Sequence, residues 1–459
     1  MCIRDSYNYE EPFELFSSHV YAKGSLILNM LHDVLGDDAF WRSIKHYTAK
    51  NKLKNVETVD LKKSIEVTTG QNLDWFFKQW VYEPGFPEYD VSWTYNQRNK
   101  LLSLHVKQVQ DLKTTSLFKM PINVLIDNGT VEEHVIWVED LDSVFKIHTD
   151  KRPRMVVFNS GLKVPSNLKM QKSVSDLKYQ LINAPNVLDR IWAAQQLSKK
   201  KGRKIVEYAL LESAKEDSFW AVRSEAYSSL GKLKTKANQE DFQWIKNNEK
   251  DNRVKRSFIR SLRHQLNDDN VSRFLEDIII SDTSYYSIAD AIRILSVVDS
   301  SKAKDHVIKL LNTESHNDVI RKSALSYYGQ VKTMSNYNRL KELAQYGKFS
   351  WASRSTIIYE LSKYQKTRPK TYDYILSFLD DKDRFVRMAV IAQIGNYGNE
   401  SNYGLLDEMV EKDPVLSINS RRAKAKIQKR KNSVSKKSKT QTAEQLNKKI
   451  NAIKNILLD

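Results

Sequence analysis

The spacing of apolar residues changes twice along the chain. From Phe13 to Tyr82 they recur every three or four positions, which is the period of an α-helix packed on one side. Between Tyr89 and Phe158 apolar and polar residues alternate, which is the period of a half-buried strand. From about residue 170 the helical period returns. The pattern predicts a multidomain, mainly α-helical protein with one β region.

The N-terminal helical region contains residues that typically begin or end helices. Gly36 and Gly70 each follow an apolar helical segment, and Thr58 and Asp74 stand at expected helix starts. We assign residues 7–86 to this region. Its large aromatic residues are predicted to lie in the core; they are Phe40, Trp41, Trp75, Phe76, Phe77 and Trp80.

The alternating region predicts a small β-sandwich over residues 87–165. Asn128-Gly129 is a favourable hairpin turn because Gly and Asn tolerate positive φ. Several short strands with turn signals between them are typical of two packed sheets. The predicted strands are Tyr89–Trp93, Leu102–Lys107, Ile122–Ile126, His134–Val138, Val144–Ile147 and Arg154–Phe158.

A repeat of about 33 residues fills most of the C-terminal half. A fixed period of this length predicts an α-solenoid of antiparallel helix pairs, each packed on the next. Segments such as Asp217–Gly231 and Asp383–Gly395 resemble HEAT-type repeats, and we assign residues 166–420 to this domain. We expect the recurrent Arg and Asp side chains to pair, or to cap helix ends, between adjacent units. The aligned positions are Arg190, Arg223, Lys255, Ile288, Arg321, Arg354 and Arg387.

The formal net charge of +18 is concentrated near the C-terminus. Residues 421–440 contain ten Lys or Arg and no Asp or Glu. We predict that residues 421–459 form a basic linker followed by an amphipathic helix. Basic residues without aromatic neighbours are more typical of a solvated tail than of a nucleic-acid site, so no nucleic-acid partner is expected. Binding of nucleic acid by the basic residues 421–440 stays an open alternative.

Length and composition set further limits. A chain of 459 residues accommodates about three domains. No apolar run is long enough to predict a membrane span, and Cys2 is the only cysteine, so no internal disulfide is possible. Residues 1–6 fit no pattern of the rest and are suspected to be non-native. The cellular compartment is not predicted.

Two segments resemble the M1 family of zinc aminopeptidases, which are gluzincins. They are His19–Tyr47, which contains Val-Tyr-Ala-Lys-Gly, and Asp74–Trp93, which contains Gly-Phe-Pro. The resemblance implies that residues 7–86 are the helical end of a thermolysin-like catalytic domain. It further implies hydrolysis of the N-terminal residue from peptide substrates.

Tyr21 is the one catalytic residue that the resemblance carries over. In the family, the Tyr before Lys-Gly stabilises the reacting carbonyl oxygen through its hydroxyl. Such a donor lowers the energy of the transition state more than that of the ground state. Gly24 is expected to let the helix start pass close to neighbouring backbone.

The sequence offers no zinc ligands of the kind that the resemblance implies. The usual helical solution is His-Glu-x-x-His, and here no two histidines are four apart. The resemblance implies zinc in the intact protein. Because this sequence lacks the ligands, we expect them before residue 1. On this interpretation the chain is a fragment of an aminopeptidase and is inactive alone. The histidines are His19, His32, His46, His105, His134, His148, His264, His306 and His316.

A second hypothesis is a non-catalytic scaffold. Such a protein would keep the M1-like architecture without zinc and bind a protein partner through the repeats. A third is a nucleic-acid-associated scaffold that uses the basic tail.

Overall fold

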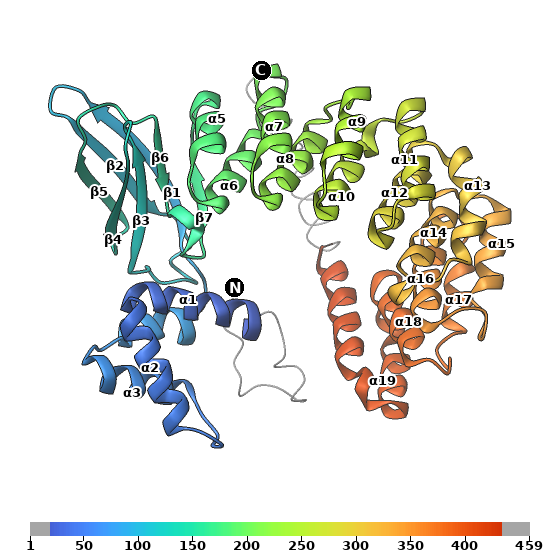
Figure 1. Cartoon of the computed structure of the whole chain (residues 1–459). Helices are drawn as coiled ribbons and strands as arrows, with labels where there is room; N and C mark the ends of the chain where they lie inside the picture. The colour runs from blue at the N-terminus through green and yellow to red at the C-terminus, as the bar shows by residue number, and fades with distance from the viewer. Residues whose placement is uncertain (1–18, 434–459) are drawn as a thin grey trace, which may run out of the picture. The chain divides into compact units, whose positions relative to one another are not determined.

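The computed structural model describes residues 19–433, which form two compact units. The first unit extends to Thr235 and the second begins at Lys236. Figure 1 shows that the first contains the N-terminal helices, all the strands and α5 to α8, and that the second is helical. The structure therefore confirms the prediction of a mainly helical chain with one β region.

The N-terminal helices begin and end close to the predicted residues. Gly36 and Gly70 both have positive φ, 79° and 71°, and end the helices before them. The feature missed by the sequence is two π-helical turns, one before the first α-helix and one after α4. The elements are η2 (His19–Lys23), α1 (Gly24–Leu35), α2 (Asp37–Lys50), α3 (Thr58–Thr69), α4 (Asp74–Phe77) and η3 (Lys78–Tyr82).

A mixed four-stranded sheet and an antiparallel three-stranded sheet form the β region, and all six predicted strands are confirmed. The first sheet has the order β5-β2-β1-β7 and the second β4-β3-β6. The short β7 was missed; it pairs parallel to β1, with Asn167 opposite Glu88, about 80 residues away in sequence. The strands are β1 (Glu88–Asn96), β2 (Leu101–Gln108), β3 (Met120–Asp127), β4 (Val131–Val138), β5 (Asp142–His148), β6 (Met155–Phe158) and β7 (Asn167–Met170).

The two sheets and the N-terminal helices share one hydrophobic core. Leu104 of the first sheet and Val124 of the second are fully buried in the same cluster as Phe76 of α4. Trp80 of η3 is also buried, and its Nε1 lies 3.1 Å from Met120 Sδ. The core placement is confirmed for most of the predicted aromatic residues, but it is wrong for Trp41, which is largely exposed.

Helices make up the rest of the described chain. In the first unit α6 packs on α8, and in the second α10, α12, α14, α16 and α18 pack in succession. Their bounds are α5 (Val174–Asn183), α6 (Val187–Leu197), α7 (Lys204–Glu216), α8 (Trp220–Leu233), α9 (Gln239–Asn248), α10 (Asn252–Ser261), α11 (Asp269–Ser281), α12 (Tyr285–Val298), α13 (Ser300–Leu311), α14 (Val319–Gln330), α15 (Met334–Leu343), α16 (Trp351–Ser362), α17 (Thr371–Leu376), α18 (Arg384–Tyr397) and α19 (Tyr403–Lys412).

The predicted pairing of Arg or Lys with Asp between successive helix pairs is confirmed at four of the aligned positions. A basic side chain on one helix reaches an Asp 26 or 27 residues later, at the start of the next packed helix. The atoms are Arg190 Nε to Asp217 Oδ2 at 2.7 Å, Lys255 Nζ to Asp282 Oδ2 at 2.9 Å, Arg354 to Asp381, and Arg387 Nη2 to Asp413 Oδ2 at 2.6 Å. Arg321 instead contacts Asp318, which directly precedes its own helix, at 2.6 Å.

The step that carries Ile288 in place of Arg is linked differently. Asp290 of α12 is buried and accepts from Arg256, Arg260 and Arg293 at 2.7–3.1 Å. Arg293 also donates to Ser323 Oγ of α14 at 2.7 Å. Ion pairs therefore join α10 to α12, and a hydrogen bond joins α12 to α14, where the repeat departs from its pattern.

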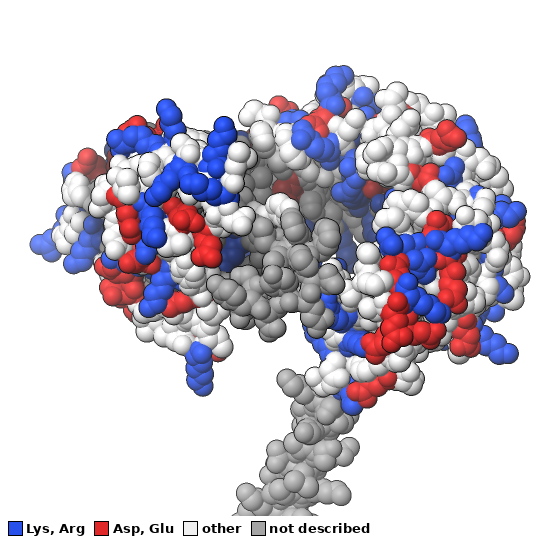
Figure 2. Space-filling view, turned by 90° about the horizontal axis from the view of Figure 1, so that it is seen from below, with Lys and Arg blue, Asp and Glu red and all other residues white. Residues whose placement is uncertain are grey.

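The predicted basic linker differs from the structure at its beginning. Residues 417–433 are helical, and Ala423 and Ile427 are buried. Arg430 donates to the carbonyl oxygens of Gly395 and Gly398 at the end of α18. The first basic residues thus lie on a packed helix, and the predicted terminal amphipathic helix lies outside the described residues. On the face in Figure 2, Lys and Arg side chains lie among Asp and Glu side chains.

A buried polar network joins the sandwich to the first helices after it. Lys172 Nζ donates to Val156 O of β6 and to Gln180 Oε1 of α5, both at 2.5 Å. Gln180 Nε2 donates to Asp189 O of α6 at 2.9 Å, and Ser160 Oγ donates to the Asp189 carboxylate at 2.6 Å. Burial lowers the pKa of Lys172 to about 7 and raises that of Asp189.

Removing Arg354 should destabilise the second unit strongly. Its side chain is 1% exposed and contacts both Asp381 and Asp383, so Arg354→Ala leaves a buried carboxylate without its partner. We expect a loss of about 3–5 kcal/mol. The control Arg384→Ala removes a half-exposed partner of Asp413 that Arg387 still contacts, and should cost less than about 1 kcal/mol. Scanning calorimetry measures both; equal losses would contradict the buried-pair interpretation.

Because Lys172 is buried, the free energy of unfolding of the first unit should increase as the pH rises. Its folded pKa of about 7 lies below the ordinary value of 10.5, so between these pH values the unfolded chain binds more protons. The free energy of unfolding then increases with pH, by at most about 1.4 kcal/mol per unit. Urea unfolding at pH 7.5 and 9.5 should show this increase, and Lys172→Met should lose it. An unchanged slope in the variant would refute the assignment.

Candidate functional site

Tyr21 lies on the π-helical turn η2, directly before α1. Its side chain is 64% exposed, whereas Met30 and Leu31 farther along α1 are buried. Single π-helical turns are frequent at functional sites because they alter the direction in which side chains project. The turn places the Tyr21 side chain at the surface of a helix that is anchored in the core.

Lys23 and Gly24 continue the motif into α1. Partial burial lowers the pKa of Lys23. The expected role of Gly24 is not found in the described part of the chain, because a Cβ built there meets no described heavy atom within 4 Å. Gly24 therefore does not permit a close backbone approach to any described segment.

A cavity of about 290 Å³ adjoins this turn. It brings together the two sequence segments that resemble the M1 family: α1 supplies one wall, and Trp80, Gly85 and Phe86 supply another. The loop 165–167 before β7 completes it. That loop carries no motif, and only the pairing of β7 with β1 brings it to the site.

Hydrogen bonds and an ion pair hold these walls in place. Gln79 Nε2 donates to Lys119 O at 2.8 Å and Gln79 Oε1 accepts from Lys119 N at 3.0 Å, which joins η3 to the segment before β3. Lys163 Nζ lies 3.2 Å from Asp33 Oδ1 of α1. The sandwich thus contacts both the helix after Tyr21 and the turn that carries Trp80.

No group of three or more His, Cys, Asp or Glu side chains within residues 19–433 could hold a metal ion. The described residues therefore do not fit a zinc site. Within the same range, no helix combines the length and apolar character that crossing a membrane requires. His19 lies at the edge of the described residues, and its side chain is not described.

The chain is similar to aminopeptidases. Residues 3–80 match the family model described as the Peptidase family M1 domain. A leucyl aminopeptidase of Saccharolobus solfataricus is 28% identical over 179 residues, which are 36% of this chain and 22% of that protein. An aminopeptidase N of Haemophilus influenzae is 26% identical over 215 residues, which are 43% and 24%. The chain spans about a quarter of the length of these relatives.

A solved structure shares the fold. The crystal structure of Legionella pneumophila aminopeptidase A in complex with aspartic acid has a TM-score of 0.61 and 17% identity; the match covers 91% of this chain and 53% of that one. The likeness therefore includes the strands and the later helices as well as the residues that match the family model.

Gly85 should be required for the wall of the cavity. Its φ is 98°, and a Cβ there would lie 2.4 Å from Thr115 Cγ2. Gly129 also has positive φ, 116°, but a Cβ there meets nothing within 4 Å. Gly85→Ala should therefore lower the stability of the first unit by about 1–3 kcal/mol more than Gly129→Ala does, as measured by urea unfolding. Equal losses would show that backbone strain alone is responsible.

Proposed function

We propose that this chain is part of an M1-type zinc aminopeptidase, a hydrolase that removes N-terminal residues from peptides. The observation that carries the proposal is the family match over residues 3–80, which includes Tyr21. The exposed position of Tyr21 supports it, because Tyr21 directly precedes Ala22 and Lys23, which line the cavity. Zinc belongs to this proposal, and no described residue supplies its ligands.

Tyr21 is the residue to which we assign a catalytic role. When water attacks a scissile carbonyl, negative charge develops on the carbonyl oxygen. A phenol hydroxyl aimed at that oxygen donates a hydrogen bond that strengthens as the charge grows. This role uses the Tyr21 Oη–H alone and is the same whichever group activates the water.

We further propose that the helices after the sandwich form a HEAT-like solenoid. The 33-residue period and the ionic contacts between successive helix pairs support this. In the proposal the residues other than Tyr21 contribute architecture, and the chain by itself has no peptidase activity.

Tyr21→Phe tests the catalytic role in the protein encoded together with its upstream coding sequence. Removing one oxyanion donor should lower kcat by about 10²–10³-fold with little change in KM for aminoacyl anilides. Tyr82→Phe is a matched control, because Tyr82 ends the other π-helical turn and is 60% exposed. A near-normal rate in Tyr21→Phe would refute the assignment, and no aminopeptidase activity in the parent protein would refute the function.

A further inference from the structure

Two basic segments lie at the same edge of the helices in the first unit. Residues 198–204, Ser-Lys-Lys-Lys-Gly-Arg-Lys, lead from α6 into α7, and residues 230–235, Leu-Gly-Lys-Leu-Lys-Thr, include the end of α8. Ser229 Oγ of α8 donates to Ala194 O of α6 at 3.1 Å, and these two helices pack on each other. Because both atoms lie near the C-terminal ends of their helices, the two basic segments begin side by side.

The positive charge at this edge is largely uncompensated. Residues 198–208 and 230–235 contain seven basic residues and one acidic residue, a net charge of +6, which is a third of the net charge of +18 of the whole chain. Within residues 19–433, Lys232 alone among the seven forms an ion pair, with Glu225 at 3.0 Å. An anionic partner would therefore meet charge that is still available for pairing. The basic residues are Lys199, Lys200, Lys201, Arg203, Lys204, Lys232 and Lys234.

Two exposed apolar side chains follow the first basic segment directly. Ile205 and Tyr208 are three positions apart on α7, so they share one face of the helix, and they are 54% and 68% exposed. Val206 and Ala209 are fully buried on the other side of α7, which anchors the helix in the core. The edge thus combines lysines with an aliphatic side chain and an aromatic side chain that has a polar end.

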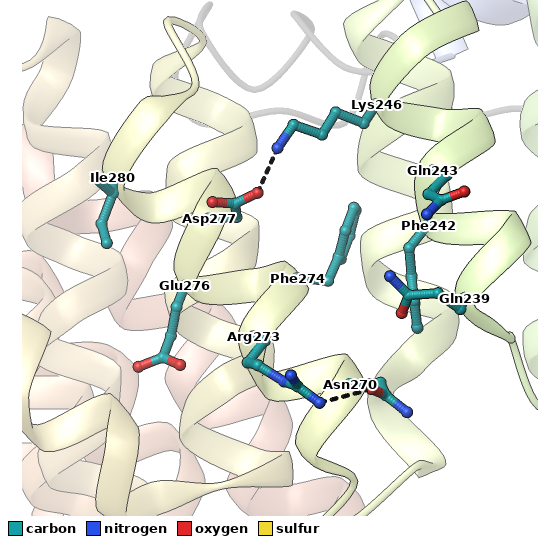
Figure 3. Close-up of a pocket in the computed structure, with 10 residues that line it drawn as sticks. All are labelled: Gln239, Phe242, Gln243, Lys246, Asn270, Arg273, Phe274, Glu276, Asp277 and Ile280. Carbon is teal, nitrogen blue, oxygen red and sulfur yellow. Dashed lines mark hydrogen bonds and ion pairs between the residues drawn. The ribbon is translucent and has the colours of Figure 1, made fainter.

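The groove between α9 and α11 in the second unit shows a different distribution of charge. Its lining includes two basic and two acidic side chains, and Lys246 Nζ lies 2.6 Å from Asp277 Oδ2 (Figure 3). The basic side chains in that groove are therefore balanced by acidic ones. At the edge formed by α6 and α8 they are not, and this difference indicates an anionic partner for that edge.

The composition of the edge favours a lipid surface over a nucleic acid. Six of the seven basic residues are Lys, whereas recognition of nucleic acids relies more strongly on the planar guanidinium of Arg. Exposed Ile205 has no counterpart among phosphates, but an aliphatic side chain can enter the boundary between lipid headgroups and acyl chains. Tyr is enriched at this boundary because its ring is apolar and its hydroxyl is polar.

We infer that this edge of the first unit binds the surface of a membrane that contains anionic phospholipids. The lysines contact the headgroups, and Ile205 and Tyr208 enter the boundary beneath them. Each basic residue close to such a surface increases the affinity about fivefold, and the effect falls off within a Debye length. The inference is independent of the proposed peptidase activity.

Sedimentation of the full chain with lipid vesicles tests the surface. At about 0.1 M salt, the protein should bind phosphatidylcholine vesicles with about 30% phosphatidylserine at least about tenfold more tightly than vesicles of phosphatidylcholine alone. Combining Lys199→Gln, Lys200→Gln and Lys201→Gln should weaken binding to the anionic vesicles about 100-fold, because three contacts are lost.

A control variant removes the same charge from another surface of the first unit. It combines Lys113→Gln, Lys146→Gln and Lys151→Gln, three exposed positions in the sandwich, and should weaken binding less than about fivefold. Equal losses in the two triple variants, or equal binding of the parent protein to both kinds of vesicle, would overturn the inference.

Ile205→Ser tests the apolar contribution. It should weaken binding to the anionic vesicles about fivefold, whereas Ile308→Ser, on α13 of the second unit and 67% exposed, should leave it unchanged. Equal binding of these two variants would contradict the entry of α7 into the lipid boundary. If the protein binds a single-stranded oligonucleotide but not the vesicles, and the variant at residues 199–201 loses that binding, the edge is a nucleic-acid site and the inference is wrong.

Discussion

The contact between a basic side chain on one helix and an Asp at the start of the next packed helix holds the repeated part of each unit together. Apolar faces alone are non-directional and would allow neighbouring helices to slide. A guanidinium that forks onto a carboxylate, as Arg190 does onto Asp217, has a defined geometry. Because each partner is largely buried, the free energy depends strongly on both being present. Register is thus specified locally at each helix pair that carries this contact.

In the first unit, helices pack against a β-sandwich rather than only against other helices. A shared core joins the N-terminal helices to the sandwich, where Trp80 and Phe76 are buried among strand residues. On the other side the connection is polar: Lys172 links β6 to α5, and Gln180 links α5 to α6. A buried network of this kind is costly unless it is satisfied, so it favours one arrangement of sheet and helices over others.

Local patterns predicted most of the fold. The pattern of apolar residues identified six of the seven described strands, and Gly36 and Gly70 identified helix ends, because these signals lie in neighbouring residues. The missed features depend on distant contacts. The four residues of β7 are a strand only because β1 pairs with them. Residues 421–433 are helical although they are highly charged, because Ala423 and Ile427 pack and Arg430 binds carbonyl groups at the end of α18.

In the candidate site, too, some features follow from local sequence and others from distant contacts. The distant contacts connect the sandwich to the helix that follows Tyr21. Sequence resemblance identified Tyr21, but the π-helical turn that carries it and the loop 165–167, which lines the adjoining cavity, were not predictable. In the role that we propose for Tyr21, its hydroxyl would have to be held to within about 0.5 Å of the developing oxyanion, which an isolated helix start cannot do. Here α1 is anchored through buried Met30 and Leu31, and its Asp33 is held by Lys163 from the loop after β6. The precision that the proposed role requires of Tyr21 would therefore rest on a core that extends through both sheets.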